Sequence, residues 1–192
     1  MDCLLMRHGV AVEMEGWSGI DETRPLTNEG RTQVRLVAQG LSAMSVSPTH
    51  LISSPLCRAQ ETAELIRASL CPSVTMIVCD ALKPDSSPEI LTAFLQTIHA
   101  SAVILCVGHE PLLGTTAGYW LTGHISHSYL MKRAGVGLIR MPSTPQIGEG
   151  LLRWWYTPAQ LITLSHIDLT RSKGERRSEE HTSELQSRGL IS

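Results

Sequence analysis

The chain has 192 residues, enough for one domain with a complete hydrophobic core, and its formal net charge is −2. This charge argues against nucleic acid or an anionic membrane as the main partner. Five cysteines without a Cys-x-x-Cys pair favour buried thiols in a reducing compartment. No apolar stretch approaches the ~20 residues of a membrane span. Arg7 and His8 also interrupt the first apolar run too early for a signal peptide, so we expect a cytoplasmic protein.

The first predicted element is a short buried strand over residues 3–6, which ends at Arg7-His8-Gly9. Side chains at the carboxyl end of a parallel strand point into the crevice where open α/β sheets bind ligands. Arg7 offers a guanidinium fork shaped for phosphate, and His8 offers an imidazole nitrogen that can attack phosphorus. Three residues alone are a weak motif, so the rest of the chain must supply the context.

Helical and extended patterns then alternate. A loop over residues 10–25 precedes a helix predicted over 27–44, which starts at a threonine N-cap and carries an apolar stripe. A short strand at 51–53 leads into a helix predicted over 55–70, with a proline at its start. A third strand, rich in β-branched residues, is expected over 74–79.

The central part of the chain repeats this alternation. A helix predicted over 87–98 has a serine cap and a proline in its first position. The most apolar strand, residues 102–107, is expected to be central and covered on both faces. A helix over 111–121 follows, and Glu110 is expected to act only as an acidic residue of its first turn.

Two further strands, predicted over 136–141 and 151–156, are close enough in sequence to pair as an antiparallel hairpin. A short helix over 157–164 completes the pattern. Because strands alternate with helices and no internal repeat is present, we predict an α/β fold. Its architecture should be a three-layer α/β/α sandwich whose mostly parallel sheet has an antiparallel edge strand.

The character of the sequence changes near residue 171. Residues 171–192 are polar and lack apolar periodicity, so we predict a disordered tail after a domain of residues 1–170. Residues 177–187, RSEEHTSELQS, resemble the conceptual translation of a common sequencing adapter. We therefore interpret about 176–192 as an artefact and exclude it from the fold.

Three of the predicted strands end in residues suited to bind phosphate. The first gives Arg7 and His8, the second leads to Arg58 in a first helical turn, and the central strand ends at His109. In a parallel sheet these ends lie along one edge, so the four side chains can converge. Such a cationic pocket fits a phosphoryl group, whose transfer needs charge neutralisation and an in-line nucleophile. The sequence therefore predicts phosphoryl chemistry at this edge.

Four motifs, in this order, resemble those of the histidine phosphatase superfamily, also called phosphoglycerate mutase-like. They are Met6-Arg7-His8-Gly9, Arg24-Pro25-Leu26-Thr27-Asn28-Glu29-Gly30, Ser53-Ser54-Pro55-Leu56-Cys57-Arg58-Ala59-Gln60-Glu61-Thr62-Ala63 and Val107-Gly108-His109-Glu110-Pro111. The resemblance extends to about residue 165. The short chain and the RPLT block are most similar to the SixA-type phosphohistidine phosphatases within this superfamily.

This resemblance implies a phosphoglycerate mutase-like fold and a phosphatase that needs neither metal nor cofactor. It implies that His8 is the nucleophile and becomes phosphohistidine, while Arg7, Arg58 and His109 hold the phosphoryl oxygens. Arg24 would be a further phosphate ligand. The implied substrate is a phosphorylated histidine in a signalling protein. Two alternatives stay open: a small-molecule phosphomonoesterase that acts on small phosphate esters, and a non-catalytic module that binds phosphate or phosphohistidine.

The sequence departs from the superfamily pattern in two places. Mutases and many small-molecule phosphatases carry an asparagine shortly after the RHG motif, and residues 10–14 contain none. The general acid of those enzymes follows the third strand. In this chain, residues 81–87 contain a single carboxylate, Asp85, which is a candidate acid but is also typical of a turn. A placed acid accelerates reactions by ~10²–10⁴, and an alcohol leaving group needs it more than an imidazole does. The pattern therefore favours phosphohistidine over a phosphate ester.

Overall fold

The computed structural model describes residues 1–166, which form a single mixed sheet between two helical layers. The strand order is β3-β2-β4-β1-β5-β6. The strands are β1 Asp2–Arg7, β2 His50–Ser53, β3 Met76–Val78, β4 Val103–Gly108, β5 Val136–Arg140 and β6 Leu151–Tyr156. The first four in chain order run parallel, whereas β5 is antiparallel to β1 and β6 is antiparallel to β5. The predicted α/β fold, with a mostly parallel sheet and an antiparallel edge strand, is confirmed.

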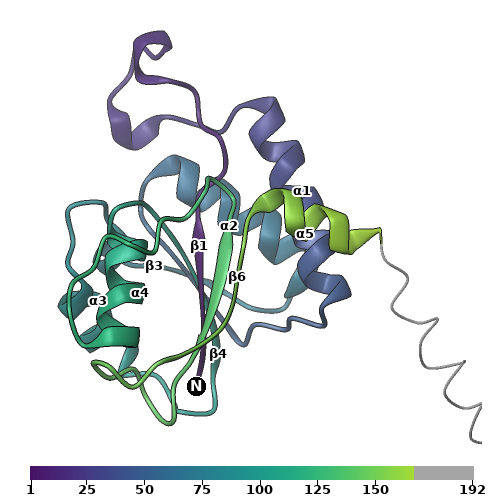
Figure 1. Ribbon diagram of the computed structural model, residues 1–192. Coiled ribbons are helices and arrows are strands. Elements are labelled where there is room, and N and C mark those ends of the chain that lie inside the picture. The colour runs from purple at the N-terminus through teal and green to yellow at the C-terminus, as the bar shows by residue number, and fades with distance from the viewer. Residues whose placement is uncertain (167–192) are drawn as a thin grey trace, which may run out of the picture.

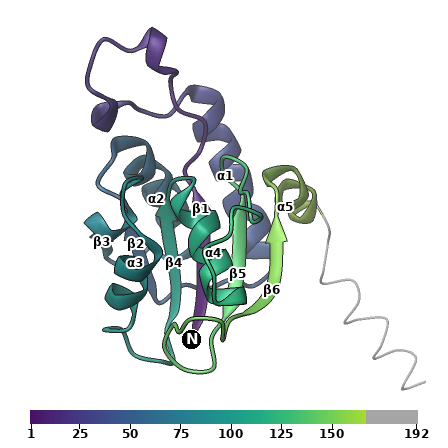
Figure 2. The same cartoon turned by 60° about the vertical axis from the view of Figure 1, so that its left-hand side comes forward.

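The helices cover both faces of the sheet (Figures 1 and 2). They are α1 Asn28–Ala43, α2 Cys57–Leu70, α3 Pro88–Leu95, α4 Leu112–Thr122 and α5 Pro158–Ser165, with short 3-10 turns η1 Met14–Gly16, η2 Asp21–Thr23 and η3 Asp80–Leu82. Helices α1, α2 and α5 pack together on one face, and α3 and α4 pack together on the other. The segment between β1 and α1, which contains η1 and η2, projects beyond the carboxyl end of β1 (Figure 1).

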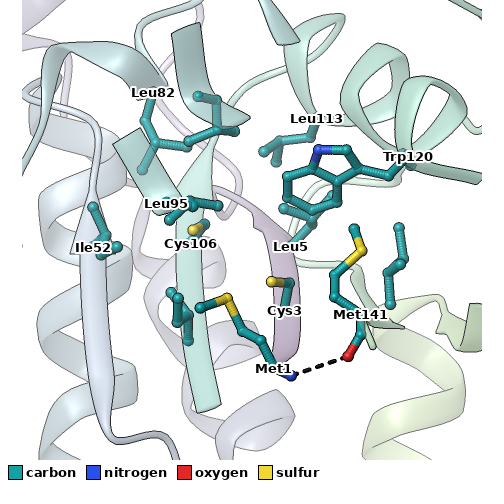
Figure 3. Packing of buried hydrophobic residues seen from close by; sticks show 14 of the residues in the cluster. Met1, Cys3, Leu5, Ile52, Leu82, Leu95, Cys106, Leu113, Trp120 and Met141 are labelled. Carbon is teal, nitrogen blue, oxygen red and sulfur yellow. Dashed lines mark hydrogen bonds between the residues drawn. The ribbon is translucent and has the colours of Figure 1, made fainter. Parts of the chain in front are cut away.

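Alternation along the central strands divides the core between the two faces. In β1, Cys3 and Leu5 belong to the cluster under α3 and α4, whereas Leu4 and Met6 belong to the cluster under α1, α2 and α5. Successive strand side chains point to opposite faces, so a strand that is apolar throughout must be covered on both. Figure 3 shows the first cluster, in which Trp120 is fully buried.

Most element boundaries lie within one residue of the sequence prediction, and three elements differ from it by two or three residues. Helix α2 begins at Cys57 because Leu56, with extended backbone, is its N-cap, so Pro55 precedes the helix. Helix α3 ends at Leu95, three residues before the predicted end at 98. Strand β3 is short because it pairs only with β2, and the register ends where Ser53 faces Val78. None of these differences moves the residues at the carboxyl edge.

The predicted disordered tail at 171–192 and the predicted artefact at about 176–192 lie outside the described residues. The prediction of a domain over 1–170 therefore stays a prediction. Within residues 1–166, no helix combines the length and the apolar character needed to cross a bilayer.

Candidate active site

Strand register brings His8 and His109 together at the carboxyl edge of the sheet. Arg7 faces Gly108 in the parallel β1–β4 pair, and the backbone N–H of His8 donates to the Gly108 carbonyl (3.0 Å). The two imidazole centroids lie 5.0 Å apart, with the ring planes at 54°. Both side chains are buried, as the fractional exposures of 7% for His8 and 2% for His109 show. Two histidines a hundred residues apart in sequence thus share one site.

The β2–α2 connection adds Ser54 and Arg58 to this edge. The backbone N–H of Ser54 donates to the Val107 carbonyl (2.9 Å), and the Ser54 hydroxyl lies 2.8 Å from Nε2 of His109. Arg58, the second residue of α2, is buried. Thr62, one turn later, accepts from the backbone N–H of Gly9 (3.0 Å) and donates to the Arg58 carbonyl (2.7 Å). Helix α2 is therefore tied directly to the RHG turn.

Two glycines allow α1 to pack against the RHG turn. A Cβ atom on Gly9 would lie 2.7 Å from Cγ2 of Val34 in α1. A Cβ atom on Gly30 would collide with the carbonyl oxygen of Val10. A glycine inside a helix lowers the stability of that helix. Gly30 is explained by the close approach of α1 to the Val10 backbone, which leaves no room for a side chain.

Arg7 is held by the segment that precedes β5. Its Nη1 donates to the Met131 carbonyl (2.9 Å), and the backbone N–H of Met131 donates to Oε1 of Glu110 (3.0 Å). Glu110 is not a first-turn residue of α4 as predicted, because it precedes the N-cap Pro111; its carboxylate lies against Gly114 in that turn and also accepts from the backbone N–H of Met131. The carboxylate of Glu110 thus helps to fix the backbone group that orients Arg7.

The protonation state of His8 follows from its surroundings. Nδ1 lies 2.7 Å from the Gly9 carbonyl, which can only accept, so Nδ1 carries the proton and Nε2 keeps its lone pair. Burial lowers the pKa of His8 to about 3, against the opposing effect of the Gly9 hydrogen bond, and the nearby cations Arg58 and Arg7 lower it further. Near pH 7 the ring is therefore neutral and nucleophilic at Nε2.

Burial also lowers the pKa of His109 to about 3, with contributions from His8 and Arg58. The Ser54 hydroxyl accepts from the backbone N–H of Leu56 (3.4 Å) and can donate its own proton to Nε2 of His109. In this arrangement the neutral ring of His109 carries its proton on Nδ1 and can donate it.

Three buried donors of this cluster have no hydrogen-bond partner within residues 1–166: Nε of Arg7, Nε of Arg58 and Nδ1 of His109. Buried polar groups are nearly always paired, because an unpaired one costs about 1–3 kcal/mol. Three such donors on one cluster, two of them on guanidinium groups, suit a tetrahedral anion better than any neutral ligand.

Arg24 joins the cluster through Asp21. Its Nε and Nη2 donate to Oδ1 of Asp21 (2.9 and 2.7 Å), and its Nη1 donates to the Val12 carbonyl (2.7 Å). Arg58 binds the same residue, with Nη2 on Oδ2 (3.0 Å) and Nη1 on the Asp21 carbonyl (2.9 Å). Although partial burial raises the pKa of Asp21, hydrogen bonds from Arg24 and Arg58 outweigh it and hold the pKa below its usual value.

The structure therefore brings Arg7, His8, Arg58 and His109 together and links Arg24 to them. It does not bring Asp85 to them. Asp85 lies exposed in the turn after η3 and makes no hydrogen bond or ion pair with the cluster among the described residues.

Sequence reasoning missed Asp21, Ser54, Thr62 and the role of Glu110. Only Asp21 carried a signal, because its Asp-x-x-Arg spacing from Arg24 suits an ion pair within a turn.

A hollow of about 690 Å³ lies between η2, α1 and α2. It is lined by Glu22 and Thr23 of η2, by Pro55 and Cys57 at the start of α2, and by side chains of α1 and α2 that include Arg31. None of Arg7, His8, Arg58 and His109 lines this hollow, so it is separate from the site of phosphoryl chemistry.

Comparison with known proteins identifies the family. The model of the histidine phosphatase superfamily (branch 1) matches residues 3–83. An uncharacterised protein of Picosynechococcus sp. is 34% identical over 139 residues, which cover 71% of this chain and 82% of that protein. The phosphohistidine phosphatase SixA of Escherichia coli (strain K12) is 27% identical over 163 residues, 84% of this chain and 96% of SixA.

Solved structures agree with this assignment. The protein histidine phosphatase SixA complexed with tungstate matches with a TM-score of 0.73 and 25% identity, over 84% of this chain and 99% of that one. A phosphoserine phosphatase from Entamoeba histolytica, in complex with 3-phosphoglyceric acid, shares the fold with a TM-score of 0.60 and 18% identity, over 81% and 96% of the two chains. The chain belongs to branch 1 of the histidine phosphatase superfamily, and within it the chain is SixA-like.

Proposed function

We propose that this SixA-like phosphatase works through a covalent phosphohistidine at His8 and removes phosphate from a phosphorylated histidine in a protein. One observation carries the proposal. A buried, neutral imidazole with a free Nε2 lone pair lies beside three buried donors that lack partners within residues 1–166. A nucleophile and a set of oxygen-binding donors are the two parts that phosphoryl transfer requires.

In the first step, Nε2 of His8 attacks phosphorus while the bond between phosphorus and the substrate nitrogen breaks. Nδ1 of His8 keeps its proton on the Gly9 carbonyl, so the phosphorylated ring is an imidazolium. The substrate imidazole, protonated by solvent on its other nitrogen, departs as a neutral ring with the bonding electron pair. Arg7, Arg58 and His109 would donate to the three equatorial oxygens as negative charge spreads over them.

In the second step, water attacks the phosphorus of phospho-His8. The bond to Nε2 breaks, its electron pair returns to the ring, and the products are orthophosphate and neutral His8. Because Nδ1 stays protonated throughout, His8 leaves as an uncharged imidazole and needs no proton in this step. The Gly9 carbonyl thus serves both steps by fixing the tautomer.

The choice of phosphohistidine rests on the leaving group. Asp85 is exposed and apart from the cluster, and Asp21 is ion-paired to two arginines with a lowered pKa, which keeps it ionised. An ionised carboxylate cannot donate a proton to an alcohol oxygen, whereas an imidazole departs without a strong acid. The similarity to SixA of E. coli supports the same substrate class.

Phosphate release from two substrates tests this function. We expect rapid release from a phosphohistidine-carrying protein and slow release from p-nitrophenyl phosphate, with both lost in His8→Ala. The matched control is His99→Ala, which removes an exposed histidine just before the amino end of β4, at the opposite end of that strand from His109, and should leave both rates unchanged. Wild type that folds but releases no phosphate from either substrate would refute the proposal.

A further inference from the structure

A carboxylate already lies against the arginines that we assign to the phosphoryl group. Asp21 uses both carboxylate oxygens and its carbonyl to bind Arg24 and Arg58. All three nitrogens of the Arg24 guanidinium are engaged within this loop, and only Nε of Arg58 has no partner among the described residues. A phosphoryl oxygen that binds either Nη atom of Arg58 must therefore lie next to Asp21 or take its place.

Asp21 lies on the solvent side of the cluster. The exposed fraction of its side chain is 41%, whereas that of Arg58 is 6%. His8, the proposed nucleophile, is buried, as Arg58 is. In-line displacement places the leaving group opposite the nucleophile, and a leaving group that belongs to a protein must extend toward solvent. The half-exposed Asp21 carboxylate on Arg58 is therefore close to the side from which the leaving group departs.

We propose that Asp21 is a specificity-determining residue. Its negative charge beside the phosphoryl pocket favours leaving groups that are neutral or cationic, such as the imidazole of phosphohistidine. It disfavours phosphate esters that carry a carboxylate near the phosphoryl group. This inference rests on the proposed function, because it assumes that the phosphoryl group binds Arg58 beside His8.

The loop offers a matched control for charge. Glu22 follows Asp21 in η2 and carries the same charge, but it is exposed and makes no hydrogen bond or ion pair with either arginine in the described part of the chain. If the effect came only from the general negative charge of the loop, Glu22→Gln would reproduce Asp21→Asn. If the effect comes from the carboxylate that binds Arg58, only Asp21→Asn will change the preference for neutral or cationic leaving groups.

The test compares two probes that differ by one carboxylate, phenylphosphonate and 4-carboxyphenylphosphonate, by titration calorimetry on the full chain. Neither is hydrolysed, so binding is measured without turnover. We expect wild type to bind phenylphosphonate more tightly. In Asp21→Asn this preference should shrink about three- to tenfold, the range that Coulomb's law gives for one charge at several ångströms. Asp21→Ser should lose the preference to the same extent as Asp21→Asn. Glu22→Gln should keep the wild-type ratio of the two dissociation constants.

Each outcome of these titrations supports or overturns the assignment of Asp21. An unchanged ratio of the two dissociation constants in Asp21→Asn and Asp21→Ser, with wild type binding both probes, would overturn the inference and leave the proposed function intact. Equal weakening of both probes would also overturn it, because Asp21 would then be only a positioning residue for the arginines. If wild type binds neither probe, the phosphoryl pocket itself is wrong, and the proposed function fails together with the inference.

Discussion

At the scale of single residues, the site depends on two imidazoles that burial keeps neutral. The pKa of His8 and that of His109 are both about 3 in the folded chain, against 6.5 for an unperturbed histidine. Between these values the unfolded chain binds protons that the folded chain does not, so the free energy of unfolding falls as the pH falls from 6.5 toward 3. Linkage gives a loss of about 2 kcal/mol per histidine at pH 5.

Urea unfolding at pH 7 and pH 5 measures this loss. His109→Gln should make the free energy of unfolding less sensitive to pH by about 2 kcal/mol over this interval. His99→Gln, at an exposed position, should keep the wild-type dependence. Equal pH dependence in wild type and His109→Gln would show that His109 is not held neutral by burial.

Glu110 affects the site indirectly, because it binds the backbone of Met131, which in turn binds Arg7. Glu110→Ala removes the acceptor for the Met131 N–H, so the carbonyl that holds Nη1 of Arg7 is free to shift. We expect kcat/KM for the phosphohistidine protein to fall about 10- to 100-fold, as displacements of about 1 Å commonly cause. Glu110→Gln keeps an acceptor oxygen and should recover most of this loss.

The control for Glu110 is Glu89→Ala, which removes an exposed glutamate from the first turn of α3. We expect kcat/KM of Glu89→Ala to equal that of wild type. If Glu110→Gln were as impaired as Glu110→Ala, the carboxylate charge rather than the hydrogen bond to Met131 would be responsible.

The four central residues could be predicted because they lie at strand ends, where the topology of a parallel sheet fixes their position. His8 and His109 follow β1 and β4, and Arg58 follows β2 by five residues. The role of Asp21 could not be predicted in the same way. Its contact with Arg58 depends on how the segment between β1 and α1 folds back, and no periodic pattern encodes that path.

At the scale of elements, the alternation of strands and helices was predicted well, because the buried residues of the central strands β1 and β4 are apolar and three helices begin at strong caps. The side chains of Thr27, Ser87 and Thr157 each accept a backbone N–H in the first turn, as their residue types predict. Boundaries without such a cap were predicted less well. Helix α2 is the example, because Leu56 offers no side-chain acceptor and Pro55 gave a misleading signal.

Gly30 links helix α1 to the catalytic turn. In Gly30→Ala the new methyl group would collide with the Val10 carbonyl, so α1 and the RHG segment must separate. We expect a loss of about 1–3 kcal/mol in the free energy of unfolding, typical of overpacking, and a lower kcat/KM. Gly16→Ala is the control, because a Cβ atom there has no neighbour within 4 Å among the described residues. Equal stability of the two variants would contradict the close packing of α1 on Val10.

At the scale of the whole molecule, the last helix within residues 1–166 is α5, which packs on α1. The solved SixA structure aligns over 99% of its length with 84% of this chain. We therefore expect a chain that ends at residue 172 to keep the melting temperature and the kcat/KM of the full chain. Thermal unfolding and phosphate release measure both, and a clear loss of either would show that the domain extends beyond residue 170.

The central claim is the covalent intermediate on His8. Wild type should be mixed with a stoichiometric phosphohistidine protein, quenched in alkali within one turnover and mapped by mass spectrometry. We predict phosphate on the peptide that contains His8, stable in alkali and lost in acid, absent from His8→Asn and present in His99→Asn. Full phosphate release by wild type with no phosphorylated peptide, or with phosphate on a different residue, would contradict the account.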